Sequence, residues 1–177
     1  RHCGDRSGIL ARHYMDIAVI GAGLAGLSFA ASLAKDRCLD QTRCRIVVFE
    51  RTVELDCGVL QSLPLREQGF QALRDLGFPG GLEVQVSRMK ILQWLAQRLP
   101  DGTLRCGREF RGLRLEDGRL MCSFASLEGK MAWEGPFDLV VAADGLQSAV
   151  RQHAEHCNAG VRVLLLGDAR RIFRAES

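Results

Sequence analysis

The sequence predicts an α/β fold in which a parallel sheet and its helices are combined with a three-stranded antiparallel meander. Three features carry this prediction. A glycine-rich turn joins an apolar strand to a helix near the start of the chain. Period-two patterning then runs through residues 104–137, and a continuous apolar run, residues 137–143, follows it. With 177 residues, 47% of them hydrophobic and 25% charged, the chain is large enough to bury a core of its own.

Residues 15–50 are predicted to form a strand, a helix and a second strand. The first strand is the apolar run Ile17–Ile20, which suits a strand covered on both faces. The helix is expected from about Leu24 to Lys35, with small side chains on its packed side. The second strand, Cys44–Glu50, is apolar from residue 46 to residue 49 and ends in a carboxylate.

The turn in this unit has the spacing G-x-G-x-x-G, at Gly21, Gly23 and Gly26. The first glycine permits a tight turn, the second leaves room for a pyrophosphate, and the third lets the helix pack close to the sheet. The helix N-terminus offers N–H groups to phosphates. Glu50 can accept hydrogen bonds from both ribose hydroxyls and would repel a 2′-phosphate. The predicted ligand is therefore FAD or NAD rather than NADP.

Two further helices are expected before the meander. One begins near Pro64 and ends at Gly77, and the other follows Ser87 as its N-cap and stops at Pro100. A glycine-bearing polar stretch separates them.

The meander is predicted over residues 104–137, with turns at residues 116–118 and 128–129. After it, the apolar run ends in Asp144-Gly145, where a parallel strand would end. A helix over about residues 146–156 and a last strand over residues 161–166 complete the expected order. The alternating apolar residues of the meander are Leu120, Cys122 and Phe124.

Charge and cysteine content exclude several classes of protein. A net charge of +3, with no basic block, argues against nucleic acid as a partner.

The seven cysteines form no C-x-x-C pair, and no leading apolar segment resembles a signal peptide, so free thiols in the cytoplasm are expected. The cluster at residues 153–157 matches no zinc spacing, and no stretch is long enough to span a membrane. We therefore predict no metal and no membrane association.

Four segments together resemble the flavoprotein monooxygenases of the aromatic-hydroxylase type. These are the glycine loop with Glu50, Arg88 at the start of a helix, and residues 144–151, which match the D-G-x-x-S-x-x-R signature. The fourth is Gly167-Asp168, which is similar to the G-D motif near the ribityl chain of the flavin. Their order and the position of the meander also agree with that family.

The resemblance implies a Rossmann-like FAD-binding fold and an NAD(P)H-dependent enzyme. Such enzymes hydroxylate a small aromatic or other electron-rich substrate through a flavin C4a-hydroperoxide, and the flavin carries that chemistry. No residue stands out as catalytic. The predicted cofactor-binding residues are Gly21, Gly23, Gly26, Glu50, Arg51, Arg88, Asp144, Gly145 and Asp168.

One departure from the family concerns domain organisation. A long substrate-binding segment normally separates the D-G signature from the G-D motif, but here Gly167-Asp168 follows after a single expected helix and strand. We predict an unstructured extension over residues 1–14 and one FAD-binding domain over residues 15–177. The substrate domain would be missing between about 152 and 161. Either the chain is a truncated relative, or its last strand resembles the G-D motif by chance.

The missing domain leaves three functional interpretations open. The first is an FAD-dependent monooxygenase that truncation has impaired, so that it acts only as an uncoupled NAD(P)H oxidase. The second is an NAD-binding dehydrogenase domain, which explains the glycine loop but not the meander and the D-G signature. The third is a non-catalytic dinucleotide-binding subunit. An oligomer, or a partner protein, would be expected to cover the exposed flavin face.

Overall fold

The computed structural model describes residues 15–35, 44–55, 62–63, 67–79, 86–156 and 163–165. In these residues a five-stranded parallel sheet has the order β10-β9-β1-β2-β5. Its strands are β1 (Met15–Ile20), β2 (Cys44–Phe49), β5 (Leu104–Arg105), β9 (Leu139–Ala142) and β10 (Val163–Leu165).

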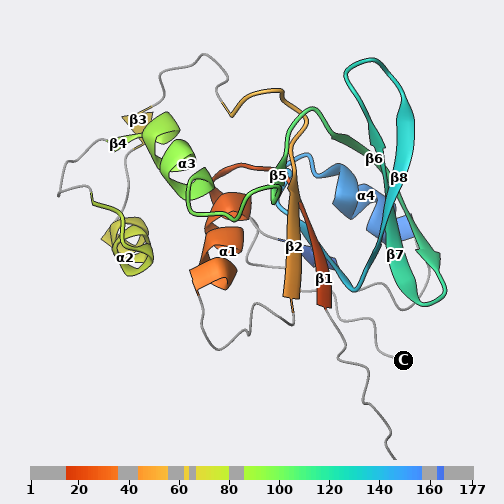
Figure 1. Cartoon of the computed structure of the whole chain (residues 1–177), viewed down its shortest axis with the longest axis horizontal. Helices are drawn as coiled ribbons and strands as arrows, with labels where there is room; N and C mark the ends of the chain where they lie inside the picture. Colours follow the sequence, from red (N-terminus) through yellow and green to blue (C-terminus); the bar gives the residue numbers. More distant parts are fainter. Residues whose placement is uncertain are drawn as a thin grey trace, which may run out of the picture.

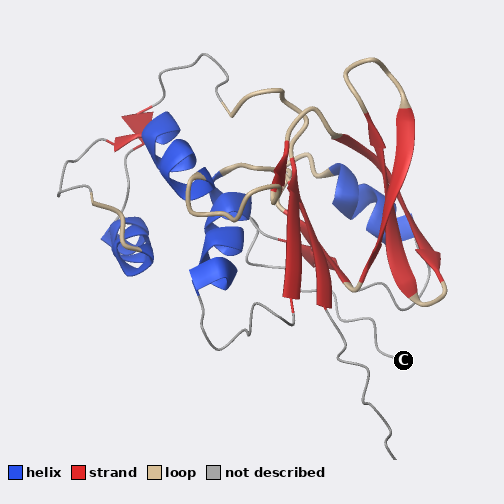
Figure 2. Ribbon diagram, in the orientation of Figure 1, coloured by secondary structure: helices blue, strands red, loops and turns tan. Residues whose placement is uncertain are grey.

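Three helices cover one side of the sheet, and the meander with a fourth helix covers the other (Figures 1 and 2). The helix side holds α1 (Leu24–Lys35), α2 (Glu67–Leu76) and α3 (Arg88–Ala96), with the short pair β3 (Ser62–Leu63) and β4 (Val86–Ser87) beside them. The other side holds α4 (Ala149–His156) and the meander. The meander consists of β6 (Glu109–Glu116), β7 (Arg119–Ala125) and β8 (Met131–Phe137).

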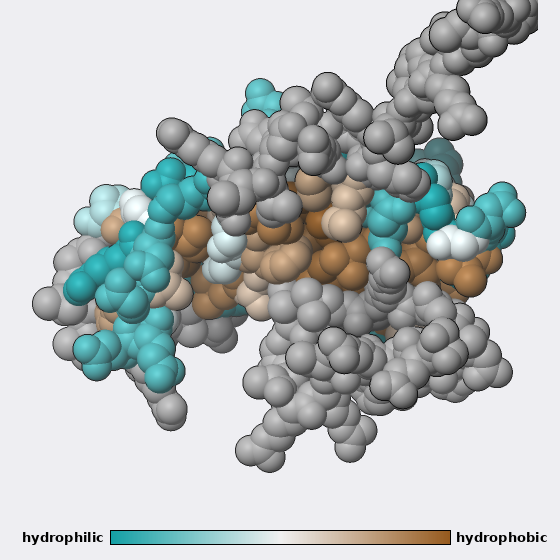
Figure 3. All heavy atoms as spheres, turned by 90° about the horizontal axis from the view of Figure 1, so that it is seen from below, coloured by the Kyte–Doolittle hydropathy of each residue, from teal (hydrophilic) through white to brown (hydrophobic). Residues whose placement is uncertain are grey.

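Alternation along β1 explains why both faces of the sheet are covered. Ile17 and Val19 belong to the apolar cluster shared with the helices, whereas Ala18 and Ile20 belong to the cluster shared with the meander. All four are buried, as a central strand requires. Seen from below, apolar atoms form a band between two more hydrophilic sides of the molecule (Figure 3).

The cluster on the meander side is built around Phe49 at the end of β2. Its ring stacks on Phe124 with centroids 4.1 Å apart and meets Phe137 edge-on at 6.1 Å. Burying side chains of this size contributes roughly 1.5–3 kcal/mol each. The aromatic contacts therefore bind the meander firmly to the end of the sheet that carries Glu50.

Several sequence predictions are confirmed. The fold class is the predicted one, and α1 has the predicted bounds. The β6–β7 turn has Asp117 and Gly118 at φ of 50° and 76°, as a two-residue hairpin turn requires. At the end of α2, Gly77 has φ of 89°, and Phe78 N–H donates to the Leu73 carbonyl at 2.8 Å, which is a Schellman ending.

Other boundaries were wrong. The meander begins at Glu109 rather than at residue 104, because Leu104 and Arg105 pair in parallel with β2. The described part of α2 begins at Glu67, and because Pro64 lies outside the described residues, the predicted start near it stays a prediction. α4 begins at Ala149 rather than at residue 146, because the Asp144 carboxylate holds the first amides of the helix. The 1–14 segment also lies outside the described residues, so its predicted lack of structure stays a prediction.

An ion cluster joins the meander to the amino ends of two sheet strands. Arg119 of β7 donates to Asp16 at 2.8 Å and to both oxygens of Asp138 at 3.1 Å. Asp138 in turn accepts the Asp16 amide at 2.7 Å, and Arg45 reaches Asp16 at 2.7 Å. The hydrogen bond to Asp16 and the charges of the two carboxylates raise the pKa of the Arg119 guanidinium. The cluster lies at the end of the sheet opposite the glycine loop.

Replacing Arg119 should destabilise the fold, since it leaves two neighbouring carboxylates without their shared cation. We expect Arg119→Gln to lower the free energy of unfolding by about 1–2 kcal/mol in urea titrations. Arg111→Gln is the matched control, because the Arg111–Glu109 pair is exposed and should contribute less than about 0.5 kcal/mol. Equal losses in the two variants would contradict a structural role for the cluster.

Cys122 provides a second stability prediction. Burial, reinforced by the charge of Glu134, raises the pKa of its thiol to about 12. Between pH 9 and 12 the unfolded chain would release this proton while the folded chain keeps it, so stability should fall as the pH rises. From pH 8 to pH 10, unfolding titrations should show a larger loss in the wild type than in Cys122→Ala, by on the order of 1 kcal/mol. Parallel losses would show that Cys122 does not cause the alkaline slope.

Within the described residues, no helix combines the length and apolarity needed to cross a membrane.

Candidate dinucleotide-binding site

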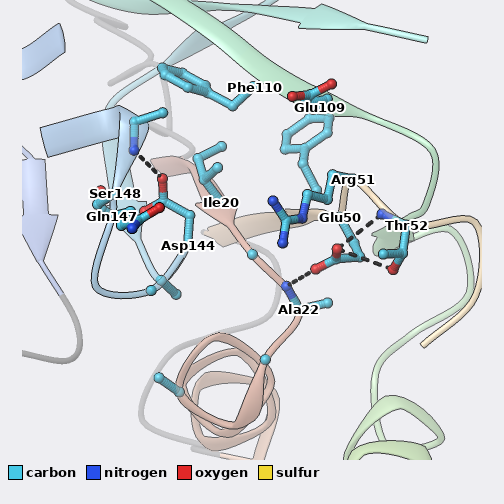
Figure 4. Close-up of a pocket in the computed structure, with 18 of the residues that line it drawn as sticks. Ile20, Ala22, Glu50, Arg51, Thr52, Glu109, Phe110, Asp144, Gln147 and Ser148 are labelled. Atoms are coloured by element: carbon cyan, nitrogen blue, oxygen red, sulfur yellow. Dashed lines mark hydrogen bonds between the residues drawn. The ribbon is translucent and has the colours of Figure 1, made fainter. Parts of the chain in front are cut away.

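A cleft of about 570 Å³ lies at the carboxyl ends of the parallel strands. The turn after β1 forms its floor, the end of β2 forms one wall and the end of β9 forms the opposite wall (Figure 4). Arg108, Glu109 and Phe110, at the start of the meander, also line it. Ligands of open α/β sheets bind at this edge, where strand order changes direction.

Two glycines of the loop are required by close backbone contacts. Gly21 has φ of 103°, and a Cβ there would lie 2.5 Å from the carbonyl oxygen of Ala143. A Cβ on Gly26 would lie 2.0 Å from the carbonyl oxygen of Gly21. Side chains at these positions would therefore separate α1 from the sheet, as the sequence spacing predicts.

The middle glycine serves a different purpose. A Cβ on Gly23 would meet no atom within 4 Å, and its φ is not in the left-handed region. Gly23 lines the cleft, and its carbonyl accepts the Leu27 amide at 3.0 Å, which starts the α1 hydrogen bonds. The amides of the first helical turn have no partner within their own helix. They and the positive end of the helix dipole suit a phosphate.

Glu50 lies at the end of β2 with its carboxylate held on both sides. Its Oε2 accepts the Ala22 amide at 2.8 Å, while Oε1 accepts the Thr52 amide at 3.0 Å. The Thr52 hydroxyl lies 3.1 Å from the same Oε1. Because a carboxylate has about four acceptor positions, Glu50 keeps capacity for a ligand hydroxyl.

Asp144 lies on the opposite side of the loop, directly after β9. Its Oδ2 accepts the amides of Ala149 at 2.8 Å and Val150 at 3.3 Å, so it caps the start of α4. Ser148 completes the cap, since its Oγ accepts the Arg151 amide at 3.0 Å. Asp144 Oδ1 is buried and has no hydrogen-bond partner in the described structure. A buried acceptor of this kind favours a donor from a ligand or from water.

Four arginines line the cleft: Arg51, Arg88, Arg108 and Arg151. Arg88 is the first residue of α3 and follows the extended Ser87, which makes no side-chain capping hydrogen bond. Arg151 donates to the Leu146 carbonyl and so ties α4 to the exposed loop before it. These guanidinium groups make the cleft suitable for a phosphate-bearing ligand.

The cleft brings together most of the predicted cofactor residues. Gly21, Gly23, Glu50, Arg51, Arg88, Asp144 and Gly145 all line it. Gly26 lies behind the loop, where it acts through helix packing, and Asp168 lies outside the described residues. No bound molecule tests these assignments, so they stay predictions.

Sequence reasoning missed Thr52, Arg108 and Phe110. Thr52 is only two positions beyond the carboxylate and so could have been considered. The other two were assigned to the meander, and no local pattern indicates that its first strand reaches the cleft. Among the described residues, no group of three or more His, Cys, Asp or Glu side chains is placed to hold a metal ion.

Comparison with known proteins agrees with this geometry. Residues 19–57 match the family described as the NAD(P)-binding Rossmann-like domain. The chain contains a Rossmann-like dinucleotide-binding domain. No curated protein sequence matches the chain.

Solved structures with the same fold include two named enzymes, at 17–20% sequence identity. Tetracycline destructase Tet(51) matches with a TM-score of 0.60 at 20% identity, over 80% of this chain and 42% of its own. The p-nitrophenol 4-monooxygenase PnpA of Pseudomonas putida DLL-E4 matches with a TM-score of 0.62 at 17% sequence identity. This match covers 80% of this chain and 44% of the PnpA chain. AlpK matches with a TM-score of 0.63 at 19% sequence identity, over 78% of this chain and 33% of the AlpK chain.

These matches confirm the resemblance to flavoprotein monooxygenases at the level of the fold. The matches cover less than half the length of each of the three structures.

The loop glycines should respond differently to alanine. Gly26→Ala places a methyl group on the Gly21 carbonyl, so we expect a loss of about 1–3 kcal/mol in the free energy of unfolding. Gly23→Ala has open space around the new methyl group, so its free energy of unfolding should fall by less than about 1 kcal/mol. The methyl group would, however, occupy the space through which a phosphate would reach the backbone. Urea unfolding and dinucleotide titration would separate the two effects. A Gly23→Ala variant that binds a dinucleotide normally would contradict the placement of the pyrophosphate.

Proposed function

We propose that this chain binds FAD in the cleft and forms the flavin-binding part of an NAD(P)H-dependent monooxygenase. The observation that carries the proposal is the pair of carboxylates, Glu50 and Asp144, on opposite sides of the glycine loop (Figure 4). Asp144 Oδ1 is buried without a partner in the described structure, so the site has an acceptor for a ligand hydroxyl. A dinucleotide supplies hydroxyl groups on both sides of its pyrophosphate.

Each part of the cleft has a role in this proposal. Glu50 would accept a hydroxyl of the adenosine ribose, and the amides after Gly23 would receive the pyrophosphate. Arg88 would neutralise phosphate charge from the start of α3. Asp144, held by the α4 amides, would present Oδ1 toward the flavin half of the ligand.

When bound, the flavin would take a hydride from NAD(P)H and activate dioxygen, so that one oxygen atom reaches the substrate. The chain's own residues bind the cofactor and orient it. We propose a small aromatic or other electron-rich substrate, as the name of PnpA illustrates for that protein. Since the chain spans less than half of these structures, we expect this part alone to act as an uncoupled NAD(P)H oxidase. A partner or a second copy would cover its exposed flavin face.

NAD itself is the second candidate ligand. The match of residues 19–57 to an NAD(P)-binding domain favours it, and the glycine loop with Glu50 accommodates either dinucleotide. The chain would then be a dehydrogenase domain or a non-catalytic dinucleotide-binding subunit. FAD is preferred because the resemblance of residues 144–151 and of the meander extends beyond the part that an NAD-binding loop requires.

The proposed location is the cytoplasm. Cys44, Cys106 and Cys122 are free thiols in the described structure, which agrees with a reducing compartment.

Cofactor content tests the proposal directly. The purified chain, as isolated and after reconstitution with FAD, should show visible flavin absorption at about one equivalent. Glu50→Gln should weaken FAD binding at least roughly tenfold, because it replaces a charged acceptor of the ribose hydroxyls by a neutral amide. Glu116→Gln, at the exposed end of β6, is the matched control and should bind normally. Failure to take up FAD, with tight NAD binding, would replace the proposal by the second candidate.

A further inference from the structure

We infer that Thr52 is a positioning residue, which holds Glu50 so that the site accepts a ribose 2′-hydroxyl and rejects a 2′-phosphate. The inference rests on the nucleotide-binding part of the proposed function. It does not depend on whether the other half of the ligand is a flavin or a nicotinamide, because Glu50 faces the adenosine end.

The first argument is the hydrogen bonding of Glu50. The Thr52 amide donates to Oε1 at 3.0 Å. The Thr52 hydroxyl lies 3.1 Å from the same oxygen and shares its one proton between Oε1 and the Glu54 carbonyl. Ala22 supplies its amide to the other oxygen at 2.8 Å. The carboxylate is therefore held between the glycine loop and Thr52, and both residues line the cleft (Figure 4). Rotation of the Glu50 side chain away from the cleft would break contacts on both sides.

The second argument is that Thr52 itself is firmly placed. Its carbonyl accepts the Gly107 amide at 2.9 Å, while the Glu50 carbonyl accepts the Arg108 amide at 2.8 Å. The Glu50 amide donates to the Arg105 carbonyl at 2.9 Å. Residues 50–52 thus continue the pairing of β2 with the segment after β5. A binding group is held accurately when its support is itself fixed by hydrogen bonds to neighbouring backbone.

The third argument concerns charge around Glu50. Arg51 lines the same cleft, as does Arg108, whose guanidinium also lies 3.8 Å from Glu134. A 2′-phosphate would therefore meet positive charge there if the carboxylate moved aside. Glu50 in its held position adds negative charge to the same cleft and opposes a phosphate. Discrimination between a 2′-hydroxyl and a 2′-phosphate therefore depends on how Glu50 is oriented as well as on its charge. Thr52 sets that orientation.

The Thr52 hydroxyl has a single proton and two acceptors. These are Oε1 of Glu50 at 3.1 Å and the Glu54 carbonyl oxygen at 2.8 Å. Valine has nearly the same shape and keeps the backbone amide, but it removes the hydroxyl. Serine keeps the hydroxyl and removes only a methyl group. The two substitutions therefore separate hydrogen bonding from shape.

The test uses the full chain, stripped of bound nucleotide, and two probes that differ only in the 2′-phosphate: ADP-ribose and 2′-phospho-ADP-ribose. Calorimetric titration should show that the wild type prefers ADP-ribose. Thr52→Val should bind ADP-ribose about threefold to tenfold more weakly and should lose a comparable part of that preference. Thr52→Ser should restore both quantities. Thr103→Val is the matched control outside the cleft and should bind both probes as the wild type does.

Two results would overturn the inference. One is a Thr52→Val variant with unchanged affinity and preference. The other is an equal loss for both probes, because a merely structural role would weaken both alike. A wild type that binds ADP-ribose but never FAD would refute the proposed flavin function while leaving the role of Thr52 intact. A wild type that binds neither probe would overturn the inference and the nucleotide site together.

Discussion

The contact of α1 with the sheet depends on backbone groups that approach more closely than side chains would allow. Gly26 lies against the Gly21 carbonyl, and Gly21 lies against the carbonyl of Ala143 at the end of β9. These contacts join three segments, the β1 turn, the first turn of α1 and the end of β9. The cleft exists because the three meet at one point, with the helix N-terminus directed at the space between them. A substitution that pushed these backbone segments apart would change both the cleft and the packing of α1 on the sheet.

The meander contributes more to the site than its distance in sequence suggests. Phe124 stacks on Phe49, which is the residue immediately before Glu50. The segment after β5 pairs with residues 50–52 and then leads into β6, which brings Arg108 and Phe110 to the cleft. At the opposite end of the sheet, Arg119 attaches the meander to Asp16 and Asp138. The meander is thus attached at both ends of the parallel strands, and the wall that carries Glu50 is held by tertiary as well as local contacts.

Asp144 shows how one side chain can serve the fold and the site. Helix capping at α4 uses one oxygen of this carboxylate and leaves the other buried and without a partner in the described residues. The same division occurs at Glu50, where protein amides orient the carboxylate and leave acceptor positions for a ligand.

Local patterns in the sequence were sufficient for the β1–α1–β2 unit, its three glycines, the two carboxylates and the β6–β7 turn, because each depends on neighbours along the chain. Backbone conformation at Asp117-Gly118 and close packing at Gly26 leave a clear signature in residue type. The start of α4 and the pairing of Leu104 with β2 were not predictable in this way. The first depends on a carboxylate five residues before Ala149, and the second on a strand far away in sequence. The places of Thr52, Arg108 and Phe110 likewise required the tertiary structure, since only the folded chain brings them to the same cleft as Glu50. The sequence by itself determined the nucleotide-binding unit, whereas long-range pairing and packing decided what surrounds it.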